Sequence, residues 1–176
     1  YKLRRGKLFN IVAVFHSDRY EEGWDSYGDP QELKTRFEGA RPEVKTLLDK
    51  IESWKMWVLC DREPTKIWSK GCVTLLGDAA HPMLQYLAAG AGMAIEDAVV
   101  LADLVGKSGG DFKESFSKYE EKRYLRAGRV QTVARIYGQL YHASNVVGEL
   151  RTEMLSGRDP NYYEGIAWLY DGINIV

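Results

Sequence analysis

The residues best suited to chemistry lie in one segment near the middle of the chain. Asp78 follows the apolar run Val73-Thr74-Leu75-Leu76, so its carboxylate should emerge at the end of a strand, where α/β sheets bind ligands. A carboxylate accepts hydrogen bonds and therefore suits the hydroxyl groups of a sugar or polyol. A predicted helix opens shortly afterwards at Gly90-Ala91-Gly92-Met93, where glycine lets the backbone approach a ligand closely. The segment thus predicts a site for a polar, partly anionic ligand.

The start of that helix is a second binding element. The first amides of a helix have no intrahelical acceptor, and they point at whatever lies beyond the helix end. The helix dipole adds positive potential there. Such an end suits a group that gains negative charge during a reaction. A glycine-rich helix start is also often only a tight turn, so spacing alone leaves both interpretations open.

Several other kinds of site are not indicated. The sequence has neither a GxGxxG nor a GxxxxGK[ST] motif, so we expect no nucleotide phosphate site. The net charge of −1, from 24 basic and 25 acidic residues, gives no argument for nucleic acid or an anionic membrane as a partner. No apolar run approaches the roughly 20 residues of a membrane-spanning helix. We expect no metal site, because the histidines lack metal-ligand spacing: His16, His81 and His142.

Composition predicts a soluble chain with a packed core. Hydrophobic residues make up 45% of the 176 residues and charged residues 28%. Cys60 and Cys72 sit in apolar stretches without a CxxC pair, which predicts two buried free thiols in a reducing cytoplasm. Because the sequence opens at Tyr1 without Met or an apolar leader, we expect it to be a fragment.

The elements that position the motif begin with a small β region. Leu8–Phe15 is rich in strand-forming residues and predicts a strand, with Tyr1–Arg4 as its partner in a hairpin. Asp29 predicts the cap of a short helix that ends near Glu38. A second short helix is expected from Arg41, and an alternating pattern over Trp54–Cys60 predicts a strand.

The second half of the sequence predicts helices. The run Val73–Leu76 predicts a strand buried on both faces. Ala91–Val105 has few polar positions, so we expect a largely buried helix that stops at Gly106. Asp111 predicts the cap of a long helix that runs to about Leu140. The other expectations are a basic side on this helix (Arg123, Arg126, Arg129), a helix over Asn145–Ser156, and a docked aromatic tail over Tyr162–Val176.

The motif region resembles a known family. The stretch from Trp68 through Gly71-Cys72-Val73-Thr74-Leu75-Leu76-Gly77-Asp78-Ala79-Ala80-His81-Pro82, then Gly90-Ala91-Gly92-Met93-Ala94-Ile95-Glu96-Asp97-Ala98, is similar to the second FAD motif of single-component flavoprotein hydroxylases of the para-hydroxybenzoate hydroxylase superfamily. Asp61-Arg62-Glu63-Pro64 and Tyr119-Glu120 with Arg123 and Arg126 also fit the family pattern, and Tyr1–Phe15 resembles its substrate-domain hairpin. The resemblance is closest to 3-hydroxybenzoate 6-hydroxylases, followed by salicylate hydroxylases.

The resemblance implies roles for individual residues. Asp78 would bind the ribityl chain of FAD, and Pro82 would lie near the reactive edge of the isoalloxazine ring. Backbone amides would face the flavin pyrimidine, and the residues that supply them are Gly90, Ala91, Gly92 and Met93. Gln85 and Tyr1 would contact the aromatic substrate. Glu96 and Asp97 would orient the helix, and His81 would be structural.

The resemblance also implies a fold. It is an α/β fold, α+β within this chain, with residues 1–60 in a substrate-binding domain, 61–106 in the FAD-binding portion and 107–176 in C-terminal helices with the tail. Two departures stand out. Ala88-Ala89-Gly90-Ala91-Gly92 replaces the Gly-Gln-Gly-x-Asn of many relatives, and the N-terminal Rossmann segment that holds the ADP half of FAD is absent. We therefore expect that the 176-residue chain alone neither holds FAD tightly nor turns over.

The implied activity of the parent protein is that of an FAD-dependent monooxygenase. It would use NADH or NADPH and molecular oxygen to hydroxylate a phenolic or benzoate-type substrate through a flavin C4a-hydroperoxide. Three alternatives stay open: a non-catalytic fragment, an interaction module whose long helix and aromatic tail mediate a homodimer, and a related flavoprotein that acts on a non-aromatic ligand.

Overall fold

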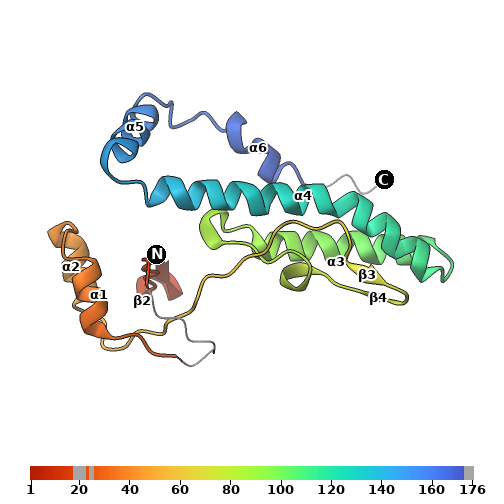
Figure 1. Ribbon diagram of the computed structural model, residues 1–176, viewed down its shortest axis with the longest axis horizontal. Helices are drawn as coiled ribbons and strands as arrows, with labels where there is room; N and C mark the ends of the chain where they lie inside the picture. Colours follow the sequence, from red (N-terminus) through yellow and green to blue (C-terminus); the bar gives the residue numbers. More distant parts are fainter. Residues whose placement is uncertain (18–22, 24–25, 173–176) are drawn as a thin grey trace. The chain divides into compact units, whose positions relative to one another are not determined.

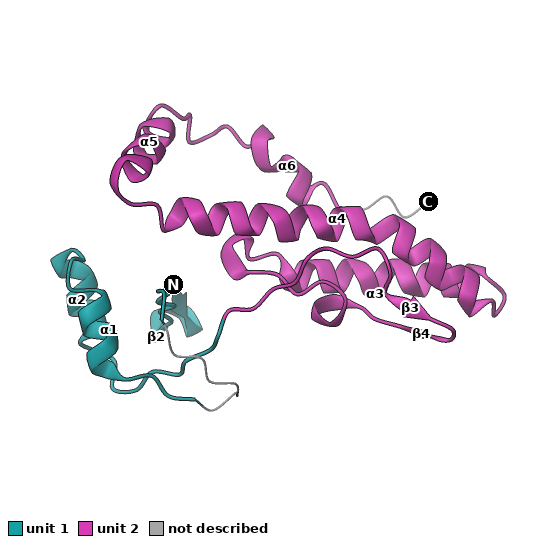
Figure 2. Cartoon of the chain, in the orientation of Figure 1, with its two compact units in different colours: residues 1–58 teal, residues 59–176 magenta. Residues whose placement is uncertain are grey.

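The chain forms two compact units in the computed structural model, Tyr1–Val58 and Leu59–Val176 (Figure 2). The structure describes residues 1–17, 23 and 26–172. The last four residues of the predicted tail, 173–176, lie outside the described residues. Within the described part of the chain, no helix is both long and apolar enough to cross a membrane.

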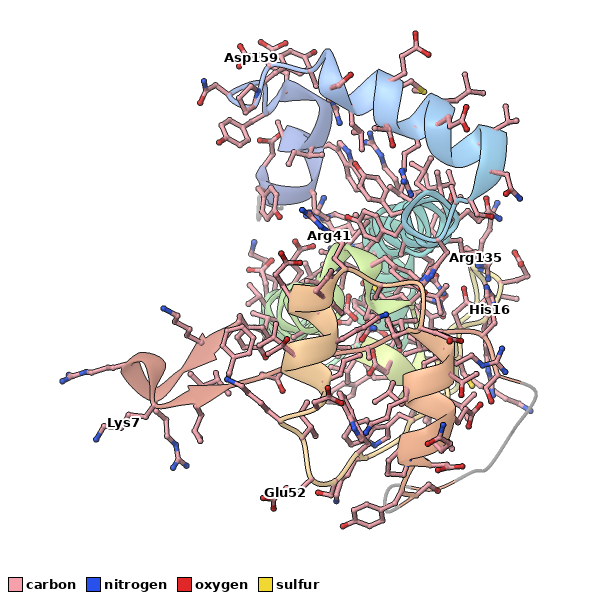
Figure 3. The ribbon with its side chains drawn as sticks, turned by 90° about the vertical axis from the view of Figure 1, so that its left-hand side faces the viewer. Lys7, His16, Arg41, Glu52, Arg135 and Asp159 are labelled. Carbon is pink, nitrogen blue, oxygen red and sulfur yellow. The ribbon has the colours of Figure 1, made fainter. Side chains whose placement is uncertain are left out.

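The first unit begins with the expected hairpin. Strand β1 (Lys2–Leu3) pairs antiparallel with β2 (Leu8–Phe9) across the 3-10 turn η1 (Arg4–Gly6), and Lys7 lies at the tip (Figure 3). The predicted strand over residues 8–15 was too long. The ladder pairs Lys2 with Phe9 and Leu3 with Leu8, and beyond it Tyr1 and Asn10 exchange two backbone hydrogen bonds at 2.8 Å.

Two short helices follow, as predicted. Helix α1 (Pro30–Arg36) is capped by Asp29, whose Oδ1 accepts the Gln31 amide at 2.8 Å. Helix α2 (Pro42–Leu48) also opens with proline, which suits the first turn because its missing N–H has no acceptor there.

The strand predicted over Trp54–Cys60 was wrong. Its only ladder contact among the described residues is the isolated bridge between Tyr27 and Lys55. Two backbone bonds support that bridge, from the Gly28 amide to the Trp54 carbonyl at 3.0 Å and from the Met56 amide to the Ser26 carbonyl at 2.9 Å. The alternating pattern is present, but one short partner segment cannot extend it into a strand.

The second unit is built on two helices that run side by side, α3 (Gly90–Lys107) and α4 (Phe112–Tyr141) (Figure 1). Asp111 caps α4 as predicted, since its Oδ1 accepts the Glu114 amide at 3.0 Å. Every third or fourth residue of α4 is buried, which gives a continuous core-facing stripe: Phe116, Tyr119, Arg123, Ala127, Val130, Ala134 and Gly138.

The segment before the motif is fastened to α4. Strands β3 (Ser69–Lys70) and β4 (Val73–Thr74) form an antiparallel hairpin. Glu120 Oε1 accepts the Trp68 amide at 2.6 Å, and the Tyr119 hydroxyl donates to the Leu75 carbonyl at 3.3 Å. The chain then passes through two 3-10 turns, η2 (Gly77–Ala79) and η3 (Gln85–Leu87), before it enters α3.

The C-terminal helices agree with the sequence predictions. Helix α5 spans Asn145–Ser156, as expected, and α6 (Glu164–Tyr170) lies in the predicted tail. The tail packs against α4 through α6, because Leu169 is buried and the Arg129 guanidinium of α4 lies 4.0 Å from the centre of the Trp168 ring.

Burial in this unit differs from the sequence predictions. The strand expected to be buried on both faces is exposed, with 66% of Val73 accessible. Helix α3 buries only Met93, Asp97 and Val100, and it ends one residue after Gly106. Both cysteines are free but exposed. An apolar side chain can be buried, but it is buried only where another element packs against it. Among the described residues, no element covers the exposed sides of this strand and of α3, or the two cysteines.

Candidate functional site

Asp78 is presented on a closed turn. Gly77 adopts φ +59°, and its carbonyl accepts the amides of Ala80 and His81, each at 2.9 Å. A side chain at residue 77 would be strained at this φ, and its Cβ would lie 3.2 Å from the Ala94 Cβ. The Asp78 side chain is exposed and makes no hydrogen bond or ion pair with any described residue. Its carboxylate is therefore available to a ligand.

The N-terminus of α3 lies beside that carboxylate. Ala88 has φ 51° and turns the chain into the helix, and Ala89 at the N-cap position supplies no side-chain cap. The first intrahelical bond runs from the Met93 amide to the Ala89 carbonyl at 2.9 Å, so the Gly90, Ala91 and Gly92 amides have no helical acceptor.

Two glycines of this helix start keep the site open. A Cβ built on Gly90 would lie 3.9 Å from Asp78 Oδ1, which places the carboxylate next to the helix end. A Cβ built on Gly92 would meet nothing within 4 Å. A free carboxylate, three unpaired amides and a positive helix end thus meet at one place.

Behind this surface lies a buried polar network centred on Asp97 of α3. Asp97 is fully buried, and its Oδ2 accepts the Gly77 amide at 2.9 Å and lies 2.6 Å from His81 Nε2. Its Oδ1 accepts Arg123 Nε at 2.7 Å. Burial alone would raise the pKa of Asp97, but hydrogen bonds from His81, Gly77 and Arg123 outweigh burial and lower it.

Glu96 extends this network to the tail. Arg123 Nη1 donates to Glu96 Oε2 at 2.5 Å, and Arg126 clamps both carboxylate oxygens at 2.7 Å each. Burial opposes ionisation of Glu96, but the hydrogen bonds from Arg126 and Arg123 prevail and lower its pKa. Arg126 also donates to the Trp168 and Leu169 carbonyls of α6 at 2.8 and 3.1 Å. The network therefore joins the turn that presents Asp78 (Gly77–His81, the motif turn) to α3, α4 and α6.

The basic side predicted for α4 was wrong for Arg123. This side chain has 0% exposure, and it lies in the core-facing stripe because it follows Tyr119 by four residues and precedes Ala127 by four. Arginine in a core needs carboxylate partners, and Glu96 and Asp97 supply them. The adjacent acidic pair on α3 was the sequence signal for this burial.

The other predicted site residues lie in different settings. Pro82 is half-buried, and its carbonyl accepts Gln131 Nε2 at 2.9 Å. Gln85 is exposed at the start of η3. Met93 points into the core with 2% exposure and its amide is used inside the helix, so it is not part of the open surface. Tyr1 is 69% exposed and belongs to the first unit.

Sequence reasoning missed two residues of α4 that hold the motif region. Gln131 is buried, and besides the Pro82 carbonyl it bonds the Arg62 carbonyl at 3.1 Å. Arg135, labelled in Figure 3, bonds Asp61 and lies 2.6 Å from Glu63. A polar residue in the buried stripe was the signal for Gln131. No local signal connects Arg135 to residues more than 70 positions earlier.

Comparison with known proteins identifies the family of this chain. The family model described as FAD binding domain matches residues 4–134. A relative named 3-hydroxybenzoate 6-hydroxylase, from Polaromonas naphthalenivorans (strain CJ2), is 40% identical over 171 residues, which cover 97% of this chain and 43% of the relative. The chain therefore spans less than half the length of that relative.

Solved structures of flavoproteins share the fold. Klebsiella pneumoniae HpxO complexed with FAD and uric acid matches 81% of this chain and 38% of its own, with a TM-score of 0.71 and 25% identity. A salicylate hydroxylase substrate complex matches 100% of this chain and 47% of its own, with a TM-score of 0.69 and 27% identity. The resemblance inferred from the motif and the mixed helix-and-sheet fold are both confirmed: the chain belongs to the FAD binding domain family, among the flavoprotein hydroxylases.

Proposed function

We propose that this chain supplies the ribityl and ring side of the FAD site in a monooxygenase that hydroxylates a small aromatic acid. The observation that carries the proposal is the unpaired Asp78 carboxylate next to the uncapped N-terminus of α3, in a chain that belongs to a flavin-binding family. Neither feature has a partner of its own among the described residues.

The residues present fit this part of the cofactor. The ribityl chain carries hydroxyl donors, which match the acceptor-only Asp78 carboxylate. The pyrimidine edge of the flavin carries acceptors and gains negative charge on reduction, which matches the Gly90, Ala91 and Gly92 amides and the helix dipole. The open space at Gly92 lets the ring approach the backbone.

The ADP half of FAD needs another part of the protein. The chain has no GxGxxG motif and spans 43% of the relative described above. We therefore propose that the 176-residue chain alone binds FAD weakly and is inactive, and that the full-length protein binds it tightly. Titration of the isolated chain with FAD tests this, since stoichiometric tight binding would contradict it.

In the complete site, bound FAD would accept electrons from NADH or NADPH and activate molecular oxygen. The chain's own residues orient the reactants. Gln85 is exposed on the turn before α3, where its amide can donate a hydrogen bond to a phenolate or carboxylate oxygen. Holding a phenolate oxygen favours hydroxylation, because the ionised ring is richer in electrons. Pro82 would border the reacting edge of the flavin, and Tyr1 would contact the substrate.

The aromatic acid is proposed from the names of the relatives. One relative is named for 3-hydroxybenzoate and one solved structure for salicylate, and both compounds carry a ring hydroxyl and a carboxylate. A second candidate is a uric-acid-like substrate, because the HpxO structure contains uric acid with FAD.

Turnover by the full-length protein tests the proposal. The purified flavoprotein is mixed with NADH or NADPH in air and with 3-hydroxybenzoate, salicylate or uric acid, and products are identified by mass spectrometry. We expect nicotinamide oxidation coupled to one added oxygen atom in 3-hydroxybenzoate. Product from uric acid alone would favour the second candidate, and a colourless protein without nicotinamide oxidation would contradict both.

A further inference from the structure

One buried carboxylate holds both ends of the turn that presents Asp78. Asp97 Oδ2 accepts the Gly77 amide at 2.9 Å and lies 2.6 Å from His81 Nε2. Asp78 lies between these two anchors in the chain. A shift of the turn relative to Asp97 would break two hydrogen bonds to an ionised group, which are among the stronger hydrogen bonds in proteins.

The same carboxylate belongs to the helix that forms the other half of the site. Asp97 follows Gly90 by seven residues on α3, and a helix rises about 1.5 Å per residue. The distance from Asp97 to the open amides is therefore set by rigid helical geometry. The Asp78 carboxylate and the amides of Gly90, Ala91 and Gly92 are thus both positioned from α3.

We propose that Asp97 and His81 are positioning residues that fix the Asp78 carboxylate relative to the amides of α3. The inference rests on the proposed function, and it adds a role for two buried residues that do not touch the ligand surface. His81 has 1% exposure and Asp97 has 0%.

The chemistry of the pair fixes which atom donates. An ionised carboxylate only accepts hydrogen bonds, so His81 Nε2 carries the hydrogen that Asp97 receives. Arg123 holds the other Asp97 oxygen at 2.7 Å, which fixes the orientation of the carboxylate. His81 Nδ1 has no partner in the described part of the chain, so the bond to Asp97 is the polar contact that the imidazole provides.

A packing role and a positioning role predict different results for substitution. The His81 ring packs against Trp68, with ring centres 5.3 Å apart, and an apolar side chain of similar size can keep that contact. Only a side chain with an N–H near the Nε2 position can keep the bond to Asp97. Glutamine places its amide nitrogen there, and leucine does not, so His81→Gln and His81→Leu form a matched pair.

The test is made in the full-length flavoprotein. FAD dissociation constants are measured by titrating apoprotein and following flavin fluorescence, together with the visible absorption of bound flavin and the thermal midpoint of the apoprotein. We expect His81→Leu to weaken FAD binding by about tenfold or more and to shift the flavin absorption. His81→Gln should restore binding to within about threefold of wild type.

Phe116→Leu is the control for a loss of stability alone. Phe116 is a buried residue of α4 in ring contact with Phe112, and it has no contact with the motif turn among the interactions described. It should lower the thermal midpoint and leave the FAD dissociation constant unchanged. Unchanged FAD binding in His81→Leu, or an equal loss in Phe116→Leu, would overturn the inference.

Hydrogen exchange in the wild-type apoprotein gives a test that needs no variant. The Gly77 amide is bonded to Asp97, so it should exchange more slowly than the Gly92 amide, which has no helical acceptor. Equal exchange rates at the two positions would overturn the inference even if His81→Leu does not fold. Wild-type protein that binds no FAD would instead overturn the proposed function, and this inference with it.

Discussion

Replacing Arg123 by methionine should destabilise the second unit strongly. Methionine keeps much of the volume of the stem but removes the guanidinium, which bonds Asp97 at 2.7 Å, Glu96 at 2.5 Å and the Met93 carbonyl at 3.2 Å. Glu96 keeps Arg126 as its partner. Asp97 keeps the Gly77 amide and His81, but this fully buried carboxylate loses its arginine.

The magnitude follows from the burial of the pair. Removing one partner of a buried ion pair costs about 3–5 kcal/mol, because the other charge stays desolvated. For a protein of this size that corresponds to a fall of roughly 6–20 °C in the thermal midpoint.

Urea unfolding followed by circular dichroism measures this, with Lys118→Met as the matched control. Lys118 lies on the same helix and pairs with Glu114 at 2.5 Å, but both side chains are more than half exposed. Exposed pairs contribute about 0.2–1 kcal/mol, so the control should change little. A loss in Arg123→Met no greater than in Lys118→Met would refute the idea that the network holds the unit together.

Two further predictions follow from the same unit. In the folded chain the pKa values of Glu96 and Asp97 lie below their ordinary 4.5 and 3.8. The stability that these two carboxylates contribute is therefore present above their ordinary pKa values and is lost as the pH falls through the lowered pKa values. Urea midpoints should fall from about pH 4.5 downward, and a midpoint that rises on acidification would contradict this. Gly138→Ala should cost about 1–3 kcal/mol, because its Cβ would lie 2.5 Å from the Tyr86 ring. In contrast, Gly106→Ala meets nothing within 4 Å and should be neutral or stabilising in thermal unfolding, and equal effects of the two changes would argue against the tight Tyr86 contact.

Local signals predicted the helices well. The capping residues Asp29 and Asp111 lie within three residues of the backbone amides that donate to them, so a short stretch of sequence carries the whole interaction. The predicted bounds of α5, Asn145–Ser156, are confirmed, because a loop precedes this segment and Gly157 follows it directly. Strands were predicted less well, since Trp54–Cys60 and Leu8–Phe15 depend on partner segments that the pattern does not specify.

The candidate site was predicted in part. The motif placed Asp78 before the helix that starts at Gly90, and the structure brings the two together. Asp97 was expected to orient the helix, but its link to Gly77 spans 20 residues and its link to Arg123 spans 26, so no local pattern reveals them. Arg123 was expected on a basic side of the long helix with Arg126 and Arg129, but it is fully buried. The spacing of Tyr119, Arg123 and Ala127 argued for burial.

The central claim is that Asp78 forms part of a flavin site. Its most direct test is FAD titration of the full-length apoprotein with Asp78→Ala and a matched control, Asp103→Ala. Asp103 lies on the same helix as the open amides and pairs with Lys107 at 3.0 Å. The account predicts tight, stoichiometric binding in wild type and Asp103→Ala, and binding about tenfold or more weaker in Asp78→Ala. Equal affinity and equal flavin content in all three proteins would contradict it.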